Sequence, residues 1–168
     1  MTANDLPPSV LGVEPEMTYR VRTSHPTEPT DGSPFGTRQY WQVSEATLTG
    51  PRITAALLAT GGDWMQMSPD GFWRPDVRVQ FRTDDDAVVL LMHYTGLVEQ
   101  TDAFAAAASE DRETAWTDQY MRLSIRFDTG APRYRWLTTS LFVAAGRLPG
   151  TSSTPCTGSP ERAGPAAC

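Results

Sequence analysis

The chain of 168 residues has the length of a single domain, and its 39% hydrophobic and 20% charged residues are typical of a globular protein. Its 20 acidic residues outnumber the 14 basic ones, so the net charge of −6 argues against a nucleic-acid partner or an anionic membrane surface, which require positive faces. Every basic residue is an arginine, and the lack of lysine excludes Schiff-base catalysis with pyridoxal phosphate.

The N-terminal half alternates strand-like segments with turn residues. Residues 1–16 predict a flexible lead-in, residues 24–36 a loop rich in proline and glycine, and the Thr-Gly-Gly-Asp sequence at 60–63 a turn. We expect four strands among these segments, at 17–23, 37–47, 53–59 and 64–67.

The clearest strand is expected at residues 72–83, because its two faces differ in polarity. One face is apolar: Trp73, Val77, Val79 and Phe81. The other face is polar: Arg74, Asp76, Arg78, Gln80 and Arg82. A turn at 84–86 and an apolar run at 87–95 complete an antiparallel hairpin. The run is apolar on both faces, which is typical of a buried central strand or of a dimer face.

The C-terminal half predicts one helix and two further strands. The alanine run within residues 100–119 favours a short helix there. Strands are expected at 121–127 and 136–148, and the Ser, Thr, Pro, Gly and Ala composition of residues 149–168 predicts a flexible tail.

Seven or eight short strands with one helix predict an all-β fold over residues 17–148, an antiparallel β-barrel or sandwich. A barrel of about eight strands can hold one small ligand. Both cysteines, Cys156 and Cys168, lie outside this domain, which argues against a thiol nucleophile or a cysteine-bound zinc. Residues 1–9 lack the features of a secretory signal, and no apolar run approaches about 18 residues, so we expect a cytoplasmic protein with no membrane partner.

An ordered series of short motifs spans the expected domain. Its members are Gly36-Thr37-Arg38, Gly50-Pro51-Arg52, Gly61-Gly62-Asp63-Trp64, Asp70-Gly71, Asp76-Val77-Arg78, Thr83-Asp84-Asp85, Tyr120–Arg122, Phe127–Trp136 and Phe142–Gly146. In this order they resemble the family of domain of unknown function 3237. The resemblance implies a calycin-like (lipocalin-like) β-barrel, often dimeric, with a central pocket for a small organic ligand. That family has glycine at the position of Asp86, so the resemblance also implies a positive φ there.

Asp76 and Arg78 are candidates for catalysis and substrate binding, because positions i and i+2 of a strand project from one face. If this face lines the pocket, Asp76 acts as a general base and Arg78 holds an anionic oxygen of the substrate. The alternative is a solvated ion pair on the outside. Periodicity favours this alternative, whereas the resemblance favours the catalytic assignment.

Asp63 is a second candidate acid or base, with Trp64 as a flat wall for an aromatic or polyene substrate. The alternative is a turn aspartate followed by a core tryptophan. Tyr94 is a third catalytic candidate, because it shares a face with Leu90 and Met92 and carries a phenol that can donate a hydrogen bond or a proton. His93 faces the opposite way and is more typical of a hydrogen-bonded core or surface histidine.

Four further residues are candidates for substrate binding. Arg38 and Arg52 flank turns and can clamp a carboxylate, the alternative being surface ion pairs. Trp41 and Trp136 complete the set. We expect no metal site, because the chain has two histidines and the aspartates at 84–86 lack the spacing of a calcium loop. We also expect no cofactor, because no glycine-rich nucleotide-binding loop occurs.

These residues favour a cofactor-independent enzyme that acts on a small, largely apolar natural-product or aromatic intermediate. The expected chemistry is acid- or base-assisted cyclisation, isomerisation, hydration or dehydration. One alternative is a non-catalytic carrier of a small molecule. Another is a scaffold whose interior is filled. A homodimer is an additional expectation.

Overall fold

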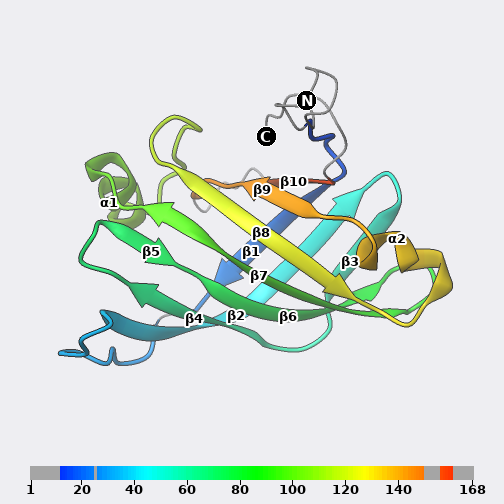
Figure 1. The fold of residues 1–168 in the computed structure, drawn as a ribbon, viewed down its shortest axis with the longest axis horizontal. Coiled ribbons are helices and arrows are strands. Elements are labelled where there is room, and N and C mark those ends of the chain that lie inside the picture. Colours follow the sequence, from blue (N-terminus) through cyan, green and yellow to red (C-terminus); the bar gives the residue numbers. More distant parts are fainter. Residues whose placement is uncertain (1–11, 25, 150–155, 161–168) are drawn as a thin grey trace, which may run out of the picture.

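The computed structural model describes residues 12–24, 26–149 and 156–160, the last of these by their backbone alone. A sheet of ten strands contains most of the described chain (Figure 1). The strands are β1 (Met17–Thr23), β2 (Thr37–Gly50), β3 (Ile53–Leu57), β4 (Gly61–Met67), β5 (Phe72–Arg74), β6 (Asp76–Thr83), β7 (Val89–Glu99), β8 (Met121–Asp128), β9 (Phe142–Ala145) and β10 (Cys156–Pro160). The predicted antiparallel β-sheet with a short helix is confirmed.

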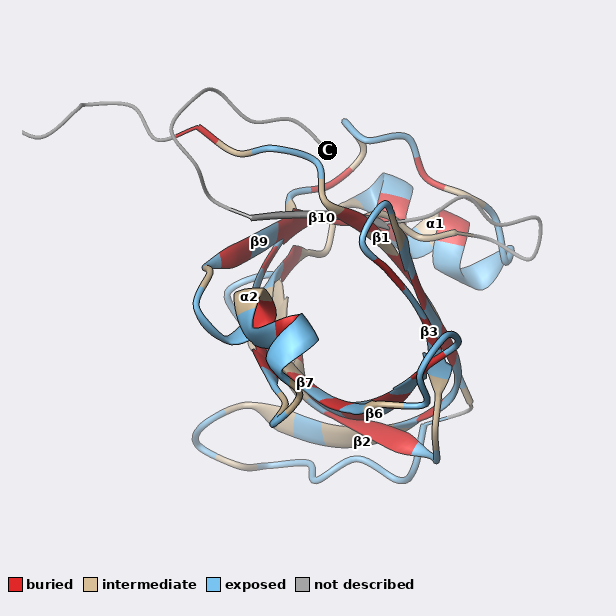
Figure 2. Cartoon of the chain, turned by 90° about the vertical axis from the view of Figure 1, so that its right-hand side faces the viewer, coloured by how far each residue is buried: buried red, intermediate tan, exposed pale blue. Residues whose placement is uncertain are grey.

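The strand pairings run in a closed cycle. Strand β1 pairs with β2, and the cycle continues through β3, β6, β7, β8, β9 and β10 back to β1, always antiparallel. Strand β4 pairs with β2 and β6, and the short strand β5 joins β4 to β7. Seen from one end, the strands form a ring (Figure 2).

Along β6 and β7, alternate residues project toward the inside of this ring. On β6, Val77, Val79 and Phe81 are buried, whereas the residues between them are exposed. The inward residues of β7, Leu90 and Met92, are fully buried as well. The apolar and polar faces predicted for residues 72–83 agree with this alternation along β6, and each buried side chain of this size contributes about 1.5–3 kcal/mol of hydrophobic stabilisation.

The predicted short helix is α1, at Asp102–Ser109. Thr101 caps its N-terminus, because the hydroxyl of Thr101 accepts the backbone N–H of Phe104 at 3.1 Å. The helix buries Phe104 and Ala107, and it lies at one end of the ring (Figure 1).

The strand predicted at 136–148 is wrong over its first half. A 3-10 turn at Pro132–Tyr134 leads into a one-turn helix, α2 (Arg135–Thr138), and only β9 is extended. Tyr134 and Leu137 are both buried, a spacing of three residues that a helical turn satisfies and a strand does not. The Tyr134 hydroxyl also donates to Asp85 at 2.9 Å, which fixes this turn against the β6–β7 connection.

The turn predicted at residues 60–63 is also wrong, because Gly61, Gly62 and Asp63 belong to β4. These glycines give space to neighbouring side chains rather than to a turn. A Cβ on Gly61 would lie 2.3 Å from Cγ1 of Val79, and one on Gly62 would lie 2.3 Å from Cε2 of Tyr40.

Three smaller differences concern the backbone. The strand expected at 72–83 is divided into β5 and β6 at Pro75, which has no N–H to donate. The positive φ expected at Asp86 occurs instead at Ala87, with φ 55°. Part of the segment expected to be a flexible tail forms β10, between β1 and β9; residues 150–155 and 161–168 lie outside the described residues, as do residues 1–11 of the expected lead-in.

Candidate functional site

A row of directly opposed residues crosses the inner face of the ring. Trp41 of β2 is opposite Asp63 of β4, Asp63 is opposite Val77 of β6, and Val77 is opposite Tyr94 of β7. Opposed residues of antiparallel strands project from the same face, with Cβ atoms about 4.5–5.5 Å apart. Since Val77 is fully buried inside, the side chains of Trp41, Asp63 and Tyr94 also project inward.

Asp63 is the charged group of this row. Its residue is only 6% exposed, and its Oδ1 accepts the backbone N–H of Asp76 at 3.0 Å. Burial raises the pKa of Asp63 from 3.8 to about 6, against the opposing effect of that hydrogen bond, and the nearby Asp76 carboxylate raises it further. A carboxyl group with this pKa can both accept and donate a proton near neutral pH.

Trp41, directly opposite Asp63 in the register of β2 and β4, carries a hydrogen-bond donor. Its indole Nε1 is buried and has no hydrogen-bond partner within the described residues. The ring of Trp41 lies 6.3 Å from that of Trp73 on β5, and Trp73 lies 6.1 Å from Phe104 of α1. Three aromatic rings from three elements therefore border the inner space on the α1 side of Asp63.

Burial is graded along the inner face. Beyond the ring's middle, inward residues such as Phe81 and Leu90 are fully buried. Toward the α1 end, the opposed pairs Thr37–Met67 and Gln39–Met65 are only partly buried, and the next pair is Trp41–Asp63. The inner face is therefore most accessible from the α1 end, and the partly exposed positions lead to Asp63.

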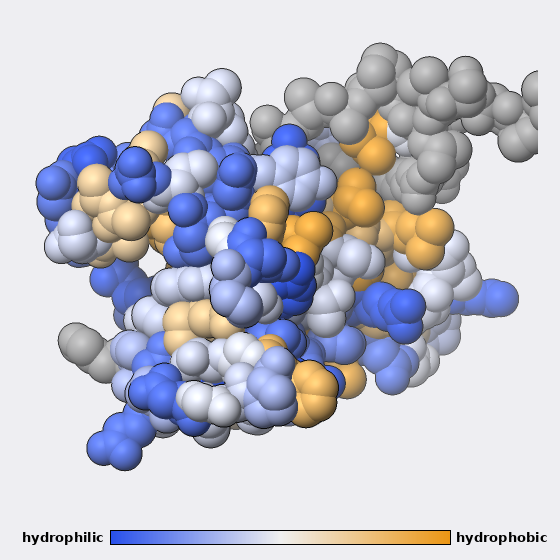
Figure 3. All heavy atoms as spheres, turned by 60° about the vertical axis from the view of Figure 1, so that its left-hand side comes forward, coloured by the Kyte–Doolittle hydropathy of each residue, from blue (hydrophilic) through white to orange (hydrophobic). Residues whose placement is uncertain are grey.

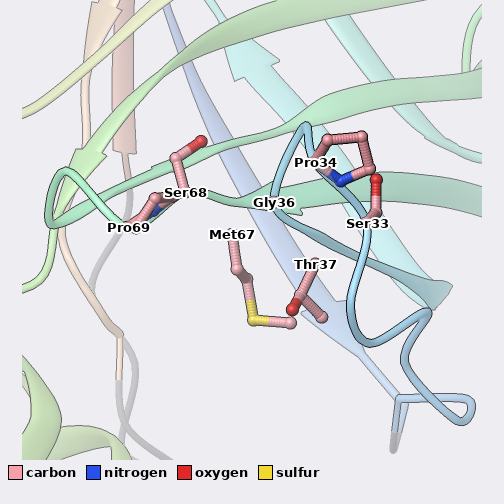
Figure 4. A pocket seen from close by; sticks show the side chains of 7 residues that line it. All are labelled: Ser33, Pro34, Gly36, Thr37, Met67, Ser68 and Pro69. Atoms are coloured by element: carbon pink, nitrogen blue, oxygen red, sulfur yellow. The ribbon is translucent and has the colours of Figure 1, made fainter.

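The rim at this end carries a shallow depression of about 350 Å³. It lies between the loop before β2 and the β4–β5 turn, and in Figure 4 the thioether of Met67 lies beside Thr37. Neither Asp63 nor Tyr94 lines the depression, and Met67 is the residue of β4 that does. Figure 3 shows this end as a surface of mixed hydropathy, with hydrophobic residues in small separate groups.

Tyr94 is 7% exposed and packs into the core, with its ring 5.7 Å from that of Tyr19. It is separated from Asp63 by Val77 in the row, so their Cα atoms are about 10 Å apart at the usual strand spacing. Asp63 and Tyr94 thus lie on the same inner face but not in mutual contact through this row.

Asp76 and Arg78 lie on the outer face, whereas the roles assigned to them require the inner face. The reason is the alternation along β6, in which the apolar residues Val77 and Val79 occupy the inside. Asp76 Oδ1 lies 2.8 Å from Nε2 of His93 and 3.3 Å from Nη1 of Arg78, so this carboxylate is engaged in an outer cluster.

Trp64 is also on the outer face, 47% exposed, and not at the inner wall expected of it. It follows Asp63 directly in β4, and successive strand residues project from opposite faces. Its ring packs edge-on against Tyr40 at 5.1 Å, and the Arg78 guanidinium lies 5.7 Å from its centroid.

The remaining candidates lie apart from Asp63. Arg38 is exposed and donates to Gln66 at 3.1 Å. Arg52 lies in the β2–β3 turn, pairs with Glu16 at 2.6 Å and stacks on Trp136, with its guanidinium 3.7 Å from the ring centroid. The pKa of Arg52 is raised by its hydrogen bond to Glu16. These three side chains connect the N-terminal segment, the turn and α2.

Of the nine predicted site residues, Trp41, Asp63 and Tyr94 lie on the inner face, and Trp41 and Asp63 are directly opposed there. Four residues that border the approach to Asp63 were not among the candidates: Met65, Met67, Trp73 and Phe104. The apolar face assigned to Trp73 was a usable signal for it. Phe104 gave none, because its position depends on where α1 packs.

The described part of the chain lacks both a cluster of metal-binding side chains and a helix able to cross a membrane. No group of three or more His, Cys, Asp or Glu side chains is placed to hold a metal ion there. Asp85 and Asp86 instead bind Tyr134 and Arg133. No described helix has both the length and the apolar character needed to cross a membrane.

Comparisons with known proteins agree with this architecture. A family model described as "Protein of unknown function (DUF3237)" matches residues 11–154, so the chain belongs to that family. A UPF0311 protein from Clostridium acetobutylicum is 27% identical over 115 residues, which cover 68% of this chain and 72% of the relative. A UPF0311 protein from Rhodopseudomonas palustris strain TIE-1 is 27% identical over 113 residues, covering 66% and 71%.

Solved structures show the same fold. A conserved protein of unknown function from Rhodopseudomonas palustris superimposes with a TM-score of 0.75 at 20% identity, covering 92% of this chain and 99% of the other. A protein from Acinetobacter baumannii, described as beta-barrel like, gives 0.75 at 20% identity, covering 94% and 99%. A Penicillium herquei protein described as an enzyme gives 0.67 at 13% identity, covering 94% and 98%.

Proposed function

We propose that this protein is a cofactor-independent acid–base enzyme, with Asp63 as the group that moves the proton. The observation that carries the proposal is the placement of Asp63: a buried carboxyl group on the inner face, at the end of a series of partly exposed inward positions. We infer further that the closed ring of strands is a calycin-like barrel whose interior receives the substrate. The substrate class is a small, largely apolar natural-product or aromatic intermediate.

Isomerisation is the reaction for which one carboxyl group suffices. The Asp63 carboxylate takes a proton from the carbon between a carbonyl group and a C=C bond, which leaves a dienolate whose negative charge reaches the far carbon of the former C=C bond. Protonated Asp63 then returns the same proton to that far carbon, the C=C bond moves next to the carbonyl group, the carboxylate is regenerated and no co-reactant is consumed. Hydration or dehydration requires a second group that handles water, and the outer position of Asp76 makes it less suited to that role.

The aromatic border supports an apolar, planar substrate. Trp41, Trp73 and Phe104 present ring faces and edges, and Met65 and Met67 are flexible enough to change rotamer when a ligand enters. The description of the Penicillium herquei protein as an enzyme is consistent with catalysis on this fold.

The test uses 5-nitrobenzisoxazole, a planar probe of carboxylate bases. A base takes its ring C–H proton, the N–O bond breaks, and a coloured cyanophenolate is released. We expect the protein to accelerate this reaction, with kcat/KM rising as pH passes through about 6 and then levelling, because the carboxylate is the active form.

Asp63→Asn removes the base while preserving shape, and should reduce the rate to that of the buffer. The matched control is Asp128→Asn, which makes the same charge change at an exposed position of β8. Equal rates for the wild type and Asp63→Asn would overturn the assignment of Asp63.

A non-catalytic carrier is the second candidate function. It is favoured by the fact that Asp76 does not share the inner face with Asp63 and Tyr94. A carrier would bind the probe, as measured by tryptophan fluorescence, yet release it unchanged, and Asp63→Asn would then alter neither rate nor product.

A further inference from the structure

Trp41 presents a buried hydrogen-bond donor that nothing else in the described structure uses. Its Nε1–H has no acceptor, and leaving a buried donor unpaired costs about 1–3 kcal/mol. A buried group without a partner in the protein calls for an explanation, and one explanation is a bound molecule that supplies the missing acceptor. The position of Trp41 directly opposite Asp63 places this donor within the proposed site.

The neighbouring carboxyl group is incompletely paired as well. Within the described residues, Asp63 accepts one hydrogen bond, from the backbone N–H of Asp76 to Oδ1. The indole N–H of Trp41 can only donate a hydrogen bond, whereas the Asp63 carboxyl group accepts when ionised and can donate when protonated. The two residues project from directly opposed positions of β2 and β4. Together they match one ligand oxygen flanked by a carbon that carries an exchangeable proton.

The surrounding rings restrict the shape of this ligand. Trp73 lies 6.3 Å from Trp41, and Phe104 packs edge-on against Trp73 at an interplanar angle of 78°. Flat hydrophobic surfaces of this kind favour a planar ring system over a branched aliphatic chain. Met65 and Met67 lie on β4, closer to the rim than Asp63. Their flexible thioether side chains can adapt to the outline of the ligand.

We propose that the Trp41 indole N–H binds the carbonyl oxygen of a planar aryl ketone and holds it beside Asp63. This inference rests on the proposed function for the location of the site. Trp41 would orient the substrate and stabilise the oxygen as negative charge develops on it, while Asp63 handles the proton at the adjacent carbon. The substrate class is thereby narrowed from apolar molecules in general to aromatic ketones with an enolisable carbon.

The test compares 1-tetralone with tetralin, which has nearly the same bicyclic shape but lacks the oxygen. In the ¹⁵N-labelled full-length protein, each of the 5 tryptophans gives an indole N–H resonance. We expect 1-tetralone to move the Trp41 resonance downfield, as a new hydrogen bond does, and tetralin not to do so. Assignment through the protein backbone keeps this measurement independent of any variant.

Two variants make the test specific. Trp41→Phe keeps an aromatic ring but removes the donor, and should weaken 1-tetralone binding about threefold to tenfold while leaving tetralin binding unchanged. Trp64→Phe is the matched control, because it makes the same change of side chain on the outer face and should leave the binding of both compounds unchanged.

The outcomes separate this inference from the proposed function. In Asp63→Asn, the 1-tetralone shift at Trp41 should persist even though the benzisoxazole reaction is lost. A Trp41 resonance that responds equally to 1-tetralone and tetralin, or to neither, overturns the role of Trp41 and leaves that of Asp63 standing. A ketone-specific shift without any catalysis overturns the enzyme and leaves a ketone-binding protein.

Discussion

Asp63 is buried at a position where ionisation of its carboxyl group costs free energy. Val77 and Trp41 are its opposed neighbours, and one backbone N–H is the polar group bound to it. A buried carboxylate with so few donors is destabilised relative to its protonated form, which is the physical origin of its raised pKa. A carboxyl group in such a position is suited to a function that requires a proton to be moved.

The stability of the fold should therefore depend on pH through Asp63. Because its pKa is higher in the folded state, its favourable contribution is complete below about pH 4 and is lost as pH rises through about 6. A rise from 3.8 to about 6 corresponds to about 3 kcal/mol. We expect Asp63→Asn to be more stable than the wild type at pH 8, by up to that amount, and no more stable at pH 4.

Urea unfolding at the two pH values measures this difference. Asp128→Asn serves as the control, because its exposed side chain loses the same charge without leaving a buried site. A destabilised Asp63→Asn protein at pH 8 would show that the carboxylate is stabilised by partners rather than strained by burial.

The roles of single side chains were only partly predictable from the sequence. Alternation along residues 72–83 is a local property, so it indicated which residues share a face with Val77. Which of the two faces Asp76 occupies depends on the core packing of the neighbouring strands. The opposition of Trp41 to Asp63 depends on the register between β2 and β4, which no local pattern encodes.

Asp63 lies in strand β4, and the residues of β4 that precede it have no room for side chains. At Gly61, an added Cβ would lie 2.3 Å from Cγ1 of Val79 and 2.8 Å from the backbone oxygen of Arg78. The side chain of Val79 could change rotamer, but the backbone of β6 could move only by disturbing its pairing with β7. Gly61 is thus required by close approach of strands rather than by a turn.

Gly61→Ala should consequently destabilise the protein by about 1–3 kcal/mol, as overpacking of a core does. It should also reduce the benzisoxazole rate, because β4 positions Asp63. Gly130→Ala is the control, since a Cβ there would have no heavy atom within 4 Å. Denaturant midpoints of the two variants provide the comparison, and equal midpoints would mean that β4 and β6 separate at little cost.

Elements with a strong local signal were predictable, and elements defined by contacts were not. The hairpin of β6 and β7 and the alanine-rich helix α1 follow from alternation and helix propensity. The segment Arg135–Thr138 has no such signal: Trp136 and Leu137 suit a strand equally well, and the burial of Tyr134 against Asp85 decides the helical turn. The composition of residues 149–168 likewise concealed β10.

Closure of the ring depends on β10, which lies between β1 and β9. It pairs with both, from Thr157 opposite Thr18 on one side to Pro160 opposite Phe142 on the other. Without it, β1 and β9 would each expose a row of unpaired backbone N–H and C=O groups, a template for pairing with another chain. The exposed side chains of Leu141 and Val143 lie at that edge and would add hydrophobic attraction.

A chain that ends at Pro149 should therefore be less stable and should self-associate, because its open edges can pair between molecules. Light scattering and denaturant unfolding measure the two effects. The control ends at Pro160 and keeps every pairing of β10, so it should behave as the full chain does. If the shorter chain kept the oligomeric state and the stability of the full chain, β1 and β9 would have to close the ring without β10, and the interior around Asp63 would not depend on the C-terminal strand.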